Sequence, residues 1–110
     1  MKLIDIHTHV YPEAIARKAA ASIRECYQLG TDEMDGTGKT LLERGTQAGI
    51  DRFLILPVSM RSDRTRHIND FILEQVEKQP RFYGFGTIHA GMEDLTGEGQ
   101  YIMDKGLRGI

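Results

Sequence analysis

The sequence predicts an α/β fold built on a parallel sheet. Short apolar runs alternate with longer segments whose apolar residues recur at helical spacing. Strands that are apolar on both faces are typical of parallel sheets, in which right-handed crossovers place helices over the strands. No linker, internal repeat or low-complexity tract divides the chain, so residues 1–110 are expected to form one small domain at most, or part of a larger one.

The first strand and the first helix are expected in the first quarter of the chain. The strand covers residues 2–8, and apolar side chains on both of its faces predict burial on both sides. The helix runs from Pro12 to about Gln28, because proline suits a first helical turn, and Gly30 ends it. Its predicted inward face consists of Ile15, Ala19, Ile23 and either Tyr27 or Cys26, the latter as a small core residue.

The later elements continue the alternation. Residues 31–38 are polar and contain glycine, which predicts a surface loop. Periodicity and Gly or Pro breaks then predict a helix at 39–48, a strand at 52–56, a helix at 67–78, a strand at 82–88, a helix at 92–105 and the start of a fourth strand at 107–110.

Composition excludes several classes of function. A formal net charge of -2 over 110 residues gives no basic surface for nucleic acid. No apolar run is long enough for a signal peptide or a membrane span. The single cysteine, Cys26, allows no intrachain disulfide, which is typical of proteins in a reducing cytoplasm. We therefore expect a cytoplasmic protein with neither a nucleic-acid nor a membrane partner.

The most informative motif is the histidine pair at the end of the first predicted strand. Side chains alternate along a strand, so His7 and His9 are expected on the same face, with Asp5 one pleat below them. Two imidazoles held on one rigid strand are suited to binding a single divalent metal ion. Asp5 is predicted to orient one of these imidazoles from behind, or else to lie in a polar layer of the sheet.

Other polar residues are weaker candidates. His89 ends the third predicted strand on the same rim as His9, and it is predicted to contact substrate. Arg61 follows the second predicted strand, and it is predicted to bind a carboxylate group of the substrate. Residues 36–40 include a Gly-Lys-Thr sequence. However, a phosphate-binding loop requires glycine at position 33, where Glu33 stands, so nucleotide binding is not expected.

The context Ile4-Asp5-Ile6-His7-Thr8-His9-Val10-Tyr11-Pro12 resembles the amidohydrolase superfamily of metal-dependent hydrolases. It looks closest to the branch that includes the amidohydrolase-2 family and its decarboxylase relatives. Three later segments fit the same family pattern. Residues 48–52 lead into the second strand, residues 81–89 form the third strand, and residues 106–110 lead into the fourth.

This resemblance implies a TIM (β/α)8 barrel whose metal site lies at the C-terminal mouth of the strands. Such a barrel takes about 250 residues, so residues 1–110 would be its N-terminal part, about three and a half β/α units. His7 and His9 would bind a divalent metal, most plausibly zinc, that activates water for attack on an amide, ester or related bond of a small-molecule substrate. The family's other ligands and its catalytic aspartate lie on later strands, so no catalytic residue is assigned and the 110-residue chain is expected to be inactive.

Three alternatives stay open. A decarboxylase could use the same scaffold. A PHP-type phosphoesterase also begins with a His-x-His strand, although that family tends to continue with a Ser-Asp-Gly-like loop where this chain has Val10-Tyr11-Pro12-Glu13. A third possibility is a non-catalytic half-barrel that self-associates through its uncovered fourth strand, and for this reason a homo-oligomer is expected.

Overall fold

The computed structural model describes residues 1–30 and 34–110 and has a mixed α/β architecture. Its elements, in chain order, are β1 (Ile4–Thr8), α1 (Glu13–Tyr27), α2 (Gly38–Gln47), β2 (Arg52–Ile55), the short 3-10 turn η1 (Ser62–Arg64), α3 (Thr65–Lys78), β3 (Phe82–Gly84) and α4 (Leu95–Asp104). The predicted order of strands and helices is confirmed. The predicted loop at residues 31–38 lies partly outside the described residues.

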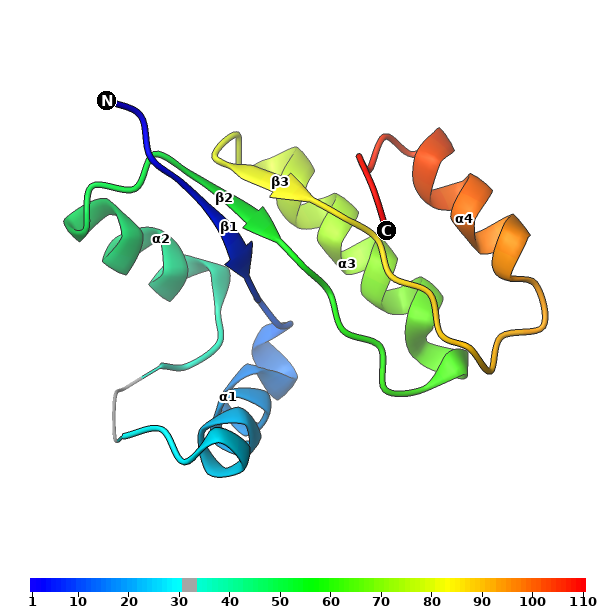
Figure 1. Ribbon diagram of the computed structural model, residues 1–110, viewed down its shortest axis with the longest axis horizontal. Coiled ribbons are helices and arrows are strands. Elements are labelled where there is room, and N and C mark those ends of the chain that lie inside the picture. The colour runs from blue at the N-terminus through cyan, green and yellow to red at the C-terminus, as the bar shows by residue number, and fades with distance from the viewer. Residues whose placement is uncertain (31–33) are drawn as a thin grey trace.

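The three strands form one parallel sheet in the order β1-β2-β3 (Figure 1). The order in space follows the order in sequence, so each crossover joins neighbouring strands. The third strand is shorter than predicted, although the chain beyond it continues to pair: the amide of Phe85 donates to the carbonyl of Ile55 at 3.1 Å.

The segment at residues 107–110 lies beside β3, as the sequence predicts for the beginning of a fourth strand (Figure 1). The amide of Gly86 donates to the carbonyl of Gly109 at 2.7 Å, and the amide of Arg108 donates to the carbonyl of Gly84 at 3.4 Å. Leu107 is buried in the core. The segment therefore occupies the edge of the sheet opposite to β1.

Helices α2, α3 and α4 pack on the same face of the sheet. Phe53 and Gly84 lie on this face, since the register pairs Phe53 with Phe82 and Ile55 with Gly84. A Cβ added at Gly45 of α2 would lie 2.1 Å from the Phe53 ring, and one added at Gly84 would lie 2.6 Å from Ile72 of α3. The core therefore lies between the sheet and one layer of helices.

The opposite face of the sheet carries apolar side chains that no described helix covers. Ile4 pairs with Arg52, and Tyr83 pairs with Leu54, which places them away from Phe53 and its helices. Ile4 is 51% exposed, Ile6 70% and Tyr83 41%. The prediction that the first strand is buried on both sides is wrong, because β1 is an edge strand with helices on one side only. We call this surface the open face.

The first helix packs on a face that only overlaps the predicted one, since Ala19 and Ile23 of that face are half-buried. Ala16 and Ala20 are its buried residues, whereas Ile15 and Tyr27 are exposed. The segment before α2 approaches the backbone of this helix closely, because a Cβ added at Gly36 would lie 2.7 Å from the Ala16 carbonyl oxygen. The thiol of Cys26 is exposed, so its predicted place in the core is also wrong.

Candidate metal centre

The histidine pair lies where β1 ends, beside the end of β2. Thr8, between the two histidines, is buried and bonded on two sides. Its hydroxyl donates to the carbonyl of Leu54 at 2.8 Å, and its own carbonyl accepts from the amide of Leu56 at 2.8 Å. A fixed residue between them restricts where His7 and His9 can point.

The pairing of β1 with β2 contains one irregularity, and His7 lies within it. Asp5 pairs with Phe53 and Thr8 pairs with Ile55. Between these two pairs β1 advances by three residues and β2 by two. Asp5 and Thr8 therefore face the same side of the sheet, whereas strict alternation would put them on opposite sides. Such bulges re-aim side chains and are common beside active sites.

The two imidazole rings lie side by side, as the sequence predicts. Their centroids are 5.1 Å apart and their planes are inclined by 73°. A ring centroid lies about 3.2 Å from a zinc ion bound to one of its nitrogens, so two rings at a tetrahedral angle have centroids about 5 Å apart. The observed separation is therefore compatible with shared coordination of one ion.

His9 is anchored so that one ring nitrogen stays available. Its Nδ1 lies 2.6 Å from the carbonyl oxygen of Leu56. A carbonyl can only accept, so this bond requires Nδ1 to carry the proton and leaves the lone pair of the neutral ring on Nε2. Metal-binding histidines in proteins are commonly held by this Nδ1–H to carbonyl bond. Sequence reasoning did not identify the Leu56 carbonyl as a partner of His9; it placed Leu56 only at the end of the second predicted strand.

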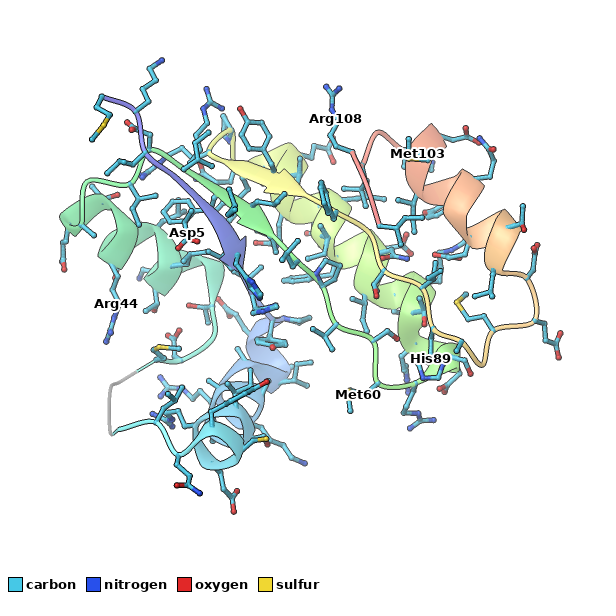
Figure 2. All side chains as sticks on the ribbon, in the orientation of Figure 1. Asp5, Arg44, Met60, His89, Met103 and Arg108 are labelled. Atoms are coloured by element: carbon cyan, nitrogen blue, oxygen red, sulfur yellow. The ribbon has the colours of Figure 1, made fainter. Side chains whose placement is uncertain are left out.

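Asp5 contacts the backbone of the pair. Its carboxylate accepts from the amide of His7 at 3.1 Å, which supports the irregular part of β1. Among the described residues no hydrogen bond joins this carboxylate to an imidazole, so a role in orienting the rings stays a prediction. Asp5 and His9 both line a pocket of about 270 Å³ between β1 and α2, whose walls are mainly apolar and include Leu41 and Phe53. In Figure 2 Asp5 lies on the α2 side of β1.

The structure does not bring the two predicted substrate contacts to the pair. His89 lies near the start of α3, away from the end of β1 (Figure 2), and its Nδ1 accepts from the amide of Gly91 at 3.0 Å. Arg61 donates from its Nε and Nη2 to the two carboxylate oxygens of Asp63, at 2.9 and 2.8 Å. This pairing holds the pKa of Asp63 below its usual value.

The histidine pair alone provides fewer ligands than a zinc site needs. In residues 1–30 and 34–110 no group of three or more His, Cys, Asp or Glu side chains is arranged to hold a metal ion. Catalytic zinc sites use about three protein ligands and a water. The donors at the end of β1 therefore fit a metal ion in kind and spacing but supply only part of its coordination.

A second cluster of polar side chains, beyond the end of β3, was missed by sequence reasoning. Asn69 is fully buried; its amide nitrogen donates to Thr87 and to Glu98, at 2.9 and 2.8 Å, and its amide oxygen accepts from the Thr87 amide at 2.8 Å. Glu98, only 3% exposed, also accepts from Arg66 at 2.7 Å. Asn69 and Arg66 lie on α3 and Glu98 lies on α4, so these hydrogen bonds join the two helices.

Comparison with known proteins adds no relative: no family model, curated protein or solved structure matches the chain. Within the described part of the chain, no helix has the length and apolar character needed to cross a membrane.

Proposed function

We propose that this chain carries the metal-binding histidine pair of a metal-dependent hydrolase of the amidohydrolase type. The observation that carries the proposal is the bond between His9 Nδ1 and the Leu56 carbonyl, 2.6 Å long, beside a second imidazole at 5.1 Å. The bond to Leu56 sets the tautomer of the His9 ring, and the His7 ring supplies the second ligand. Zinc is one of the ions that neutral imidazoles bind, and it is the ion we propose for this pair.

The arrangement of the sheet supports a barrel as the complete fold. The strands are parallel and consecutive, and α2, α3 and α4 cover one face only. Open doubly wound sheets carry helices on both faces, whereas a barrel encloses its second face. On this proposal the open face is the barrel interior, and residues 1–110 provide the first three strands and the start of the fourth.

Each residue of the site has a defined task in this proposal. His7 and His9 bind the ion, the Leu56 carbonyl holds the His9 ring, and Thr8 fixes the backbone between them. A divalent metal ion held by these residues would supply Lewis-acid chemistry for the attack of water on the substrate carbonyl. The ends of parallel strands are also where substrates bind in α/β folds, which suits the position of the pair. The remaining ligands and the proton-transferring carboxylate would come from outside the described residues.

Calorimetric titration with Zn²⁺ tests the pair directly. Wild-type protein and His67→Ala, a control that removes a histidine from α3, are expected to bind one ion with the same affinity. His7→Ala and His9→Ala are expected to weaken binding by about tenfold or more, since each loses one of two ligands. Equal affinity of all four proteins would overturn the proposal.

Hydrolytic activity is expected to be absent from the 110-residue chain, even with added zinc. The pair would supply only two ligands, and in the described part of the chain we assign no general base that could move a proton for the reaction. Assay of ester and amide substrates with and without Zn²⁺ checks this. Turnover that disappears in His7→Ala would show that the residues present already form a complete site.

A further inference from the structure

An apolar groove of about 490 Å³ lies between α1, the segment that follows β2, and the N-terminal part of α3 (Figure 1). Small-molecule sites in proteins commonly have volumes of about 300–1,000 Å³. We propose that this groove binds a small molecule that has an apolar body and a carboxylate group. Such binding would be independent of the histidine pair, because neither His7 nor His9 lines the groove.

The walls of the groove are mainly apolar, and they come from all three segments. Ile15 of α1 and Val58 after β2 are exposed, and Phe71 of α3 is half-buried. Val10 and Ile72 also line the groove and belong to the buried core, so the groove extends inward as far as the core. An apolar ligand body would release water from these surfaces, which favours its binding.

The charged side chains that line the groove are basic. They are Arg61 and Arg64, with His67 as a third group that can carry a positive charge. No aspartate or glutamate among the described residues lines the groove. Asp63 lies beside both arginines, at 2.8 Å from Arg61 and 3.9 Å from Arg64, so one negative charge is shared by two positive ones. The net charge of these three side chains is therefore positive, which favours an anionic ligand over a cationic one.

Both arginines keep N–H groups with which to bind a carboxylate. Arg61 donates to Asp63 from Nε and Nη2, and its Nη1 makes no hydrogen bond in the described part of the chain. The contact of Arg64 with Asp63 is through Nε, and the two Nη atoms of Arg64 make no hydrogen bond to a residue that the structure describes. Both side chains are more than half exposed. A guanidinium group binds a carboxylate through parallel N–H bonds, so a carboxylate is the anion that these atoms suit.

The basic residues gather where α3 begins. Arg61, Arg64 and His67 all belong to residues 61–67, and α3 starts at Thr65. The first turn of α3 contains no acidic residue, and its N-cap residue, Arg64, makes no side-chain capping bond. The partial positive charge of a helix N-terminus also favours an anion. A ligand would therefore place its carboxylate at the start of α3 and its apolar body between α1 and α3.

Two exposed residues outside the groove provide matched controls. Arg108 is an exposed arginine on the segment after α4, and Met103 of α4 is 54% exposed, close to the 52% of Ile15. In Figure 2 both control residues lie far from Met60, which lines the groove. Substitution of Arg108 or Met103 therefore removes a charge or apolar surface without changing the groove.

Titration followed by ¹H–¹⁵N correlation spectra, without added metal, tests the proposal. Phenylbutyrate is the probe, and phenylbutylamine and phenylbutanol carry the same body with a cationic and a neutral head group. The acid is expected to bind at least about tenfold tighter than the amine and about threefold tighter than the alcohol. The largest shifts are expected in the amides of residues 58–71, which include the basic side of the groove.

Variants test the two ends of the ligand separately. Arg64→Gln and Ile15→Ala are each expected to weaken phenylbutyrate binding by about threefold or more, the first through the lost charge and the second through the lost apolar contact. Arg108→Gln and Met103→Ala are expected to bind phenylbutyrate as tightly as wild type does. Circular dichroism verifies that each variant keeps its helices.

Any of four results would contradict the proposal. They are an absence of saturable binding up to the solubility limit of phenylbutyrate, equal affinity for the acid and the alcohol, shifts centred outside the groove, and equal effects of the groove variants and their controls. Equal affinity for the acid and the alcohol would mean that the groove selects only an apolar body and that its arginines bind no carboxylate.

Discussion

The polar side chains at the ends of β1 and β3 differ in how their hydrogen-bonding groups are used. Beyond β3, the amide of Asn69 and the carboxylate of Glu98 point into the helical layer and bond to each other and to Thr87. At the end of β1, Nδ1 of His9 is bonded to a backbone carbonyl, and among the described residues no hydrogen bond is made by its Nε2. The His7 ring is exposed and, among the described residues, contacts the His9 ring.

This difference distinguishes a cluster that stabilises the fold from a cluster that can bind a ligand. A buried polar group whose bonds are all made within the protein adds stability and has no capacity left for a ligand. A side chain that is oriented on one side and available on the other can bind a ligand without rearrangement. The end of β3 therefore belongs to the first kind and the end of β1 to the second.

The largest stability effect is expected in the Asn69 cluster. Asn69→Ala removes three hydrogen bonds and leaves the Thr87 backbone and one Glu98 oxygen buried without that partner. Urea unfolding is expected to show a loss of about 3 kcal/mol. Gln100→Ala, which removes an exposed bond to Asp104, is the control and should change stability by less than about 0.5 kcal/mol. A similar small change in both variants would mean that the cluster is not structural.

A second test compares two helical glycines. Gly45→Ala would place a Cβ 2.1 Å from the Phe53 ring, so overpacking is expected to cost about 1–3 kcal/mol. Gly99→Ala meets only Ile110 at 3.6 Å and is expected to stabilise α4 by about 0.5–1 kcal/mol. Thermal unfolding of both variants measures the difference. Stabilisation by Gly45→Ala would contradict the close contact between α2 and the sheet.

The histidines are expected to contribute little to stability, in contrast to Asn69. His9→Ala loses one hydrogen bond, worth about 1 kcal/mol, and His7→Ala removes an exposed ring, with an expected change below about 0.5 kcal/mol. The same urea titration measures both. A loss in His7→Ala as large as that in Asn69→Ala would assign the pair to the scaffold.

The smallest expected effect concerns the start of α2. Bonds from the backbone and side chain of Thr37, with a further bond from Thr40, hold the pKa of Asp35 below its usual value of 3.8. A carboxylate whose pKa is lowered in the folded state stabilises the fold above pH 3.8, and this contribution is lost as the pH falls through the folded-state pKa. The difference in unfolding free energy between wild type and Asp35→Asn should therefore shrink in acid. A constant difference would contradict the role of the charge.

Regular features were predictable from the sequence. Apolar runs gave the strands within a few residues, and the alternation of strands and helices predicted a parallel sheet. The proximity of His7 and His9 also followed from their spacing. These features depend on local periodicity, which a single sequence contains.

The remaining features depend on contacts between distant residues or on local irregularity. The bulge in β1 arises from its pairing with β2, and strict alternation cannot predict an extra residue. Asn69 and Glu98 are 29 residues apart, so nothing in either segment indicates the partner. The predicted face of α1 was wrong at Ile15, because this helix packs through the small Ala16 and Ala20 and leaves the larger Ile15 exposed. The covered or open state of a sheet face likewise depends on the whole fold.

The most direct test of the account is the state of the His9 ring during zinc titration, measured by long-range ¹H–¹⁵N correlation of the four histidines. The account predicts neutral His9 in the Nδ1–H tautomer, with zinc shifting the Nε2 resonance of His9 and the ring resonances of His7, and leaving His67 and His89 unchanged. A neutral His9 in the Nε2–H tautomer, or zinc shifts spread equally over all four rings, would contradict it.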